Sequence, residues 1–150
     1  MKEQMKNASD MLLMVRYMMK LYERYLENVQ IKYKLSHIEI AIIGFLYNNP
    51  ERDTAADIVE RRMLPKGNVS SGVETLVQKE LLMRRQDRTD RRKIHLSLLE
   101  NAFPIVKEIE EINQNFREQI FKNFSEEELK SYETMNDRLL ENLKEVLERK

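Results

Sequence analysis

Cysteine is absent from the 150 residues of this chain. Its absence excludes a disulfide framework, thiolate metal sites and a cysteine redox switch. Glycine and proline are scarce, with three of each, and this scarcity favours helices over sheets. The only two histidines, His37 and His95, stand far apart in the sequence, so no metal constellation can be drawn from them.

Long hydrophobic runs are missing as well. The apolar stretch 11–15 is surrounded by charged residues, no span approaches membrane length, and no signal peptide precedes the first helix. We therefore expect a cytoplasmic protein without a membrane partner. The sequence also lacks a Ser-His-Asp arrangement, a phosphate-cradling glycine loop and a histidine–carboxylate cluster. It thus predicts neither an enzyme nor a bound cofactor.

Hydrophobic periodicity and capping residues predict the helices. A broad apolar stripe at 3–4 spacing indicates a first helix over residues 8–34. Ser36 and Glu39 form a capping-box pattern that starts a second helix, which ends before Pro50. The 150 residues suit a single domain, 1–150.

Two long helices are expected in the C-terminal third of the chain. One covers 97–123, with Ser97 and Glu100 as a second capping-box pattern. Pro104 should either kink this helix or mark its true start. The other begins at Ser125, in a third capping-box pattern, and runs to about residue 148.

A helix-turn-helix is predicted between residues 54 and 79. Asp53 or Thr54 can cap a helix over 55–63, and Pro65 can be the first residue of the next helix, 66–79. The residues expected to pack inward from the first helix are Ala56, Ile58 and Val59. Those expected from the second are Val69, Val73, Leu76 and Val77.

An arginine-tipped hairpin follows at once. The stretches 82–86 and 93–97 indicate two short strands, and a polar tip, 87–92, separates them. From Arg61 to His95 the chain has ten basic and four acidic residues, a local net charge of +6 in a chain of zero net charge. A basic patch matters more for binding duplex DNA than the total charge, because neutralised phosphates release counterions. A small-residue helix followed by such a hairpin is typical of a winged helix that binds DNA.

The fold class we predict is therefore mainly α with a small β-hairpin wing. The DNA-binding lobe, a winged helix-turn-helix, covers 36–97. The DNA contacts come from helix 66–79 and wing 84–93, and the predicted residues are Lys66, Gly67, Asn68, Ser70, Ser71, Thr75, Arg84, Arg88, Asp90, Arg91, Arg92 and Lys93. The start of the helix can accept phosphate through its backbone amides, and Asn68 can pair with an adenine edge. One wing arginine can enter the minor groove, and another can pair with Asp90 or Asp87.

This segment resembles the recognition helix and wing of the MarR family of transcriptional regulators. The resemblance rests on Val69-Ser70-Ser71-Gly72-Val73-Glu74-Thr75-Leu76, on Leu81-Leu82, and on Asp87-Arg88-Thr89-Asp90-Arg91-Arg92. Two departures are informative. Ser71 stands where the family often has arginine, and Glu80 replaces a glycine that is common before the wing.

The resemblance covers nearly the whole chain and implies a homodimer on double-stranded DNA. Residues 98–150 have thirteen acidic and eight basic side chains, and an acidic end suits association with another copy better than contact with DNA. We expect 8–34 and 98–150 to be dimerisation helices, which places two recognition helices roughly 34 Å apart on a pseudo-palindromic operator.

The resemblance also implies a ligand-responsive repressor. A small-molecule effector would bind between the dimer helices and the DNA lobe and release the DNA. The candidate pocket residues are Tyr17, Met18, Tyr25 and Phe45. Two alternatives stay open: an architectural DNA binder without sequence specificity, and a helical protein-interaction module whose hairpin binds an acidic partner.

Overall fold

The computed structural model of the protein describes residues 7–149. Residues 1–6 and Lys150, which belong to the predicted domain, lie outside the described part. The chain forms two compact units, and the boundary between them falls after Phe116. The fold is mainly helical with one antiparallel hairpin, as predicted.

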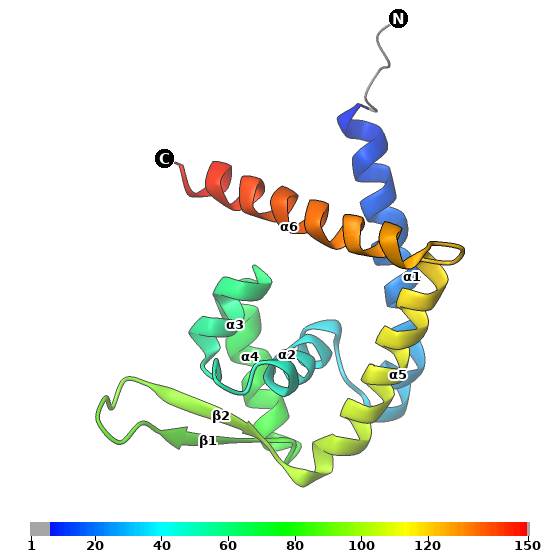
Figure 1. The fold of residues 1–150 in the computed structure, drawn as a ribbon. Helices are drawn as coiled ribbons and strands as arrows, with labels where there is room; N and C mark the ends of the chain where they lie inside the picture. The colour runs from blue at the N-terminus through cyan, green and yellow to red at the C-terminus, as the bar shows by residue number, and fades with distance from the viewer. Residues whose placement is uncertain (1–6, 150) are drawn as a thin grey trace, which may run out of the picture. The chain divides into compact units, whose positions relative to one another are not determined.

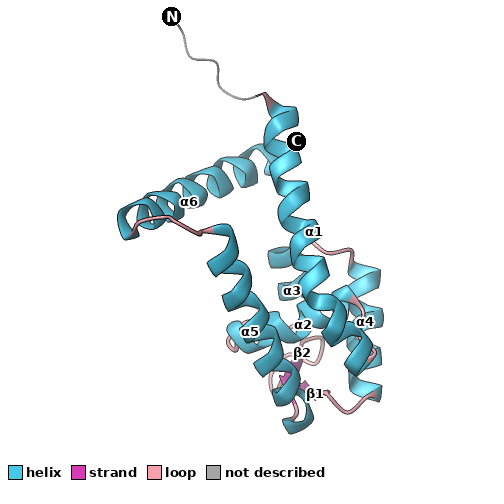
Figure 2. Ribbon diagram, turned by 90° about the vertical axis from the view of Figure 1, so that its right-hand side faces the viewer, coloured by secondary structure: helices cyan, strands magenta, loops and turns pink. Residues whose placement is uncertain are grey.

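The first unit contains the winged lobe and the helices that flank it (Figure 1). Its elements are α1 (Ala8–Tyr33), α2 (His37–Asn48), α3 (Ala55–Arg62), α4 (Lys66–Gln78), β1 (Leu82–Gln86), β2 (Ile94–Leu98), a 3-10 helix (Glu100–Ala102) and most of α5 (Phe103–Ile120). The second unit contains α6 (Glu126–Glu148). Helices make up nearly all of the regular structure, and the two strands form the wing (Figure 2).

Side-chain caps set most of the helix starts. The Glu39 amide donates to Ser36 Oγ at 3.2 Å, and the Ser36 amide donates back to Glu39 Oε1 at 3.3 Å. Ser125 and Glu128 form the same reciprocal pair at the start of α6, so both predicted capping boxes are confirmed. Each reciprocal pair satisfies two amides that would otherwise have no partner at the helix end.

The start of α5 differs from the prediction. Ser97 lies in β2, and the 3-10 helix begins after Leu99 without a side-chain cap, so the predicted capping box at Ser97 is wrong. α5 begins at Phe103 and ends at Ile120, which is shorter than the expected 97–123. Pro104 therefore lies in the first turn, where its missing N–H costs no helical hydrogen bond. Pro104 thus marks the start of the helix, as one of the two expectations had it, and does not kink it.

One hydrophobic core joins the helices of the lobe to the base of the hairpin. Ile42, Ile58, Leu76 and Leu82 are fully buried within it. Gly72 permits the close approach of α4 to α2, since a Cβ there would lie 2.8 Å from Ile42 Cδ1. Three of the four inward-facing positions predicted for α4 are buried and Val77 is half-buried, whereas Ala56 of α3, also expected inside, is exposed.

Apolar side chains outside the lobe are largely uncovered. Residues 11–15 of α1 are exposed, and α6 has no buried residue in its 23 positions. Both helices are amphipathic as predicted. The start of α6 packs within its own unit, where Tyr132 contacts Phe121 edge-on with 4.9 Å between ring centroids, but its later apolar residues remain exposed. Among the described residues, no helix is both long enough and apolar enough to cross a membrane.

Candidate nucleic-acid interface

The start of α4 offers unpaired backbone amides. α4 begins at Lys66, as predicted, so Pro65 is the N-cap and not the first helical residue, and it makes no side-chain cap bond. The Val69 amide is the first to enter the helical ladder, donating to Pro65 O at 3.1 Å. The amides of the preceding helical residues consequently have no partner within the helix and face outward at its positive end. Such an end binds phosphate.

Small and polar side chains cover this end of α4. Lys66, Gly67, Asn68, Ser70 and Ser71 are all exposed, as a surface that contacts DNA requires. Val69, Gly72 and Val73, on the opposite face of α4, are buried in the core and hold the helix in place. Thr75 is half-buried one turn further along.

Arg84 connects the wing to α4. Its guanidinium Nη2 lies 2.7 Å from Glu74 Oε2, and both side chains are about half exposed. Of the predicted DNA contacts, this arginine has a carboxylate of α4 as its partner in the absence of DNA. The pair lies across the junction between β1 and α4, whose buried contact is made by Leu82.

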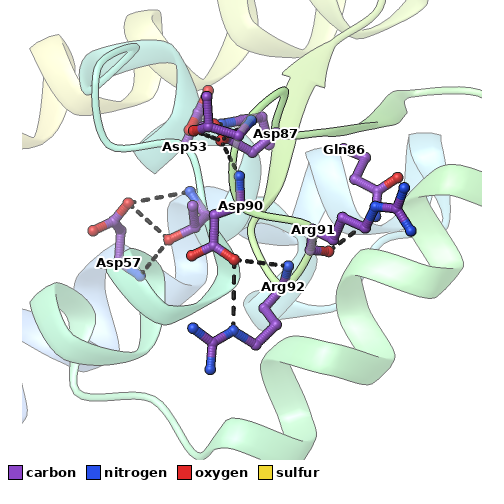
Figure 3. A network of polar contacts seen from close by, with 10 residues as sticks. Asp53, Asp57, Gln86, Asp87, Asp90, Arg91 and Arg92 are labelled. Carbon is purple, nitrogen blue, oxygen red and sulfur yellow. Dashed lines mark hydrogen bonds and ion pairs between the residues drawn. The ribbon is translucent and has the colours of Figure 1, made fainter.

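Two aspartates shape the tip of the wing (Figure 3). Asp87 Oδ2 accepts from the Thr89 amide at 3.0 Å, the Thr89 hydroxyl at 2.9 Å and the Asp90 amide at 2.9 Å. Asp90 Oδ1 accepts from the Arg92 amide at 3.0 Å and lies 3.5 Å from Arg92 Nε. One arginine thus pairs with Asp90 near the tip, as the sequence analysis anticipated.

All of the basic side chains at the tip of the wing face solvent. The Arg92 side chain is 93% exposed despite its ion pair, and Arg88, Arg91 and Lys93 are exposed too. The Gln86 amide donates to Arg91 O at 3.0 Å and holds the backbone of the tip (Figure 3). The wing therefore presents its cations on a hydrogen-bonded turn, where a phosphate backbone can reach them.

His95 has a role that the sequence analysis missed. Its Nδ1 lies 2.6 Å from Asp53 Oδ1, and its Nε2 lies 2.7 Å from Asp87 Oδ1. The hydrogen bonds to Asp53 and then Asp87 raise the pKa of His95, and His95 holds the pKa of Asp87 well below its usual range. No local motif marks this arrangement, because Asp53 is 42 residues away from His95 in the sequence.

A cavity of about 280 Å³ lies beside the lobe. Its lining residues are Met19, Tyr22, Glu23, Leu26, His37, Ile40, Ala41, Gly44, Asn48, Arg62, Ile109 and Asn113. The Tyr22 hydroxyl donates to Asn113 Oδ1 at 2.6 Å. Burial raises the pKa of Tyr22, and the charge of Arg62 opposes that rise.

The four predicted pocket residues are not among those that line this cavity. Tyr17 is exposed, and Met18 is only half-buried. Tyr25 packs edge-on against Phe116, with 6.5 Å between ring centroids. Phe45 is buried in the core, with the Arg62 guanidinium 5.7 Å from its ring centroid. Within residues 7–149, no group of histidines and carboxylates could hold a metal ion.

α3, α4 and the hairpin together make this lobe a winged helix-turn-helix, a class whose second helix enters the major groove of DNA. Comparisons with known proteins agree with that class. The sequence model of the MarR family matches residues 33–93. The HTH-type transcriptional regulator PecS of Dickeya dadantii (strain 3937) is 30% identical over 110 residues, which are 72% of this chain and 66% of PecS. The chain thus spans slightly under two thirds of that relative.

Solved structures share the fold across nearly the whole chain. S. aureus MepR in its DNA-binding conformation has a TM-score of 0.78 at 20% identity, over 92% of this chain and 99% of MepR. The S. aureus MepR–DNA complex has a TM-score of 0.73, also at 20% identity, over 93% and 99% of the two chains. The chain is thus similar to the MarR family in the sequence of residues 33–93 and in its overall fold.

Proposed function

We propose that the chain is a transcriptional regulator that binds a pseudo-palindromic operator in double-stranded DNA as a homodimer. The observation that supports this most directly is the pairing, on one lobe, of an uncapped α4 start with an arginine-tipped wing. The α4 surface is nearly neutral and small enough to approach base edges, whereas the wing concentrates positive charge. S. aureus MepR, a chain of the same fold, has been solved with DNA.

The two surfaces divide the task of recognition. Asn68 and Ser71 lie at the start of α4, where side chains of a recognition helix meet base edges. Arg88, Arg91 and Arg92 project from the wing, where the minor groove attracts cations. On this proposal α4 supplies sequence preference and the wing supplies most of the salt-dependent affinity.

A second copy of the chain is the partner we propose for the uncovered helices. The exposed stripe of α6 comprises Leu139, Leu140, Leu143, Val146 and Leu147, which are between 47% and 66% exposed. Residues 11–15 of α1 present another such stripe. Contiguous apolar surface of this kind marks a protein interface. A twofold dimer would place the two α4 helices roughly 34 Å apart along the DNA.

The cavity beside the lobe is the effector site we propose. Its walls are mostly apolar, but Tyr22, Asn113 and Arg62 place polar groups on them. A small aromatic or amphipathic molecule with one polar or anionic group fits that chemistry. Arg62 is the last residue of α3, so an occupant that contacts it bears directly on the helix-turn-helix. Release of DNA by such a molecule would make the protein a ligand-responsive repressor.

The test is fluorescence anisotropy on DNA from upstream of the chain's own gene, against a scrambled duplex, at about 150 mM salt. We expect a clear preference for the native duplex. Losing the side chain in R91A or R92A should lower the slope of log K against log salt by roughly 2, because each dimer loses two cations that neutralise phosphates flanking the minor groove. N68A should instead reduce the preference and leave the slope unchanged. K107A, which removes an exposed cation on α5, is the matched control.

Two alternatives predict different outcomes in the same assay. An architectural DNA binder would bind both duplexes equally and with full salt dependence. A helical protein-interaction module would bind heparin as well as it binds the duplex. The absence of a preference, together with unchanged binding by R91A and R92A, would contradict the regulator. The addition of small aromatic acids and phenols to the preformed complex then tests the effector site.

A further inference from the structure

His95 connects two segments that are distant in the sequence. One is Asp53, in the loop between α2 and α3, and the other is Asp87, where β1 ends. All three side chains are half-buried, between 17% and 23% exposed. A neutral imidazole has one N–H and can donate to one carboxylate only. A ring with a carboxylate oxygen within 2.7 Å of each nitrogen therefore favours the doubly protonated, positively charged form, which can donate to both.

Both carboxylates hold further structure. Asp53 precedes Thr54, the N-cap of α3, and its carbonyl accepts from the Leu96 amide at 2.8 Å. The loop before α3 therefore pairs with β2 through backbone and side chain alike. Asp87 uses its other oxygen, Oδ2, to form the turn that presents the wing arginines. The ring of His95 is thus the link between the start of the helix-turn-helix and the tip of the wing.

We propose that charged His95 is a positioning residue for DNA binding, and that its loss of a proton weakens DNA affinity as the pH rises. The ring holds the wing at a defined place relative to α3 and α4, so that both surfaces meet one stretch of duplex. When the ring is neutral, one of its two carboxylates loses its donor, and the wing is held by fewer bonds. This inference rests on the DNA binding proposed above.

The groups around His95 set the direction of the effect. Asp53 faces it from the α2–α3 loop and Asp87 from the end of β1, and both raise its pKa. Arg85, its cross-strand partner on β1, acts in the opposite direction. A raised pKa means that the link is complete below the ordinary histidine pKa and is lost as the pH rises through the raised value. Asp87, whose pKa is lowered, stays ionised throughout this range.

The variant Asp53→Asn tests the proposal, because a simple charge effect and the loss of an anchor for His95 predict opposite changes in DNA affinity. Removal of a carboxylate near bound DNA should strengthen binding if only charge matters. If Asp53 instead anchors the charged ring, D53N should weaken binding. At a pH above the pKa of the ring, the loss should approach about tenfold for each pKa unit that the ring loses, because the charged fraction falls by that factor. Glu51 is an exposed carboxylate two residues earlier in the same loop, so E51Q is the matched control. Stronger binding by both variants would overturn the proposal.

The pH profile separates positioning by charge from a merely structural role. Between about pH 6 and about pH 9, wild-type affinity for the duplex should fall by roughly tenfold, and H95Q should bind weakly with a flat profile. Equal pH slopes for wild type and H95Q would overturn the proposal. Circular dichroism of each variant checks that it folds.

Proton NMR of the DNA-free protein keeps this test independent of the proposed function. The chain has only two histidines, so H95Q identifies the signals of His95 directly. We expect the pKa of His95 to be raised in the wild type and to fall in D53N. A wild type that prefers no duplex at any pH would contradict the proposed function, whereas an unshifted His95 would contradict the link itself.

Discussion

The winged lobe and α6 contain the same kind of apolar periodicity but use it differently. In the lobe, apolar side chains from α2, α3, α4 and both strands meet in one core. In α6, an equally regular stripe remains exposed from Met135 to Leu147. The difference teaches that periodicity identifies the apolar face of a helix but does not say what covers it. In the lobe the cover is the chain itself, and for α6 we propose a second copy.

α1 shows both behaviours within one helix. Leu26 and Val29, near its C-terminus, are buried in the core of the first unit. Met11 to Val15, near its N-terminus, are exposed. The stripe predicted from the sequence is continuous, so only the structure shows where the intrachain core ends.

The largest effect should come from opening the lobe's own core. Ile42→Ala removes a fully buried side chain that packs against Gly72 of α4. We expect the free energy of unfolding to fall by about 4 kcal/mol, through lost burial and the cavity that remains. Urea unfolding followed by circular dichroism measures it. Y47A, on an exposed position of the same helix, is the control, and an equal loss there would contradict the assignment of the core.

The second-largest effect should come from placing charges on the exposed face of α6, which should weaken the dimer and leave the lobe folded. The double substitution Leu140→Lys and Leu143→Lys places cations in the exposed stripe. We expect the dimer dissociation constant to rise by at least roughly a hundredfold, since charges at the centre of an interface are left without partners. Sedimentation equilibrium measures it. The control, S131K, changes another exposed position of α6, and a dimer that persists in the double variant would argue against α6 as the interface.

The capping boxes provide a smaller contrast. Ser36→Ala in α2 should lower the free energy of unfolding of the lobe by about 1 kcal/mol, because the cap belongs to a helix that the core needs. Ser125→Ala in α6 should instead speed amide exchange at the start of that helix. The hydrogen bond from the Ser125 amide lowers the pKa of Glu128. The stabilisation from this cap is therefore fully present above the ordinary glutamate pKa, and it is lost as the pH falls through the lowered value. Equal global losses in both variants would remove the contrast.

Local features of the fold could be predicted because local residues determine them. Ser36 and Ser125 each meet their partner three residues away, and the strands of the wing are adjacent in the sequence. Ser97 was misassigned because its capping-box pattern competes with strand pairing to Met83, which a local pattern cannot weigh. Within the candidate site, the exposed residues of α4 and the wing could be predicted, while the His95 link and the lining of the cavity could not. Both depend on residues that only the tertiary fold brings together.

The smallest effect should come from Glu80, where the backbone of the lobe is strained. Its φ of 61° lies in the left-handed region, between the end of α4 and β1. A side chain in that conformation costs roughly 1 kcal/mol relative to glycine. Glu80→Gly should therefore be more stable than Glu80→Ala by about 1 kcal/mol, even though glycine is more flexible in the unfolded chain. Thermal unfolding of the two variants, both of which lack the carboxylate, isolates the backbone from the charge. If E80A were as stable as E80G, the left-handed backbone at residue 80 would cost the lobe nothing. The junction between α4 and β1 would then be as free of strain as the core.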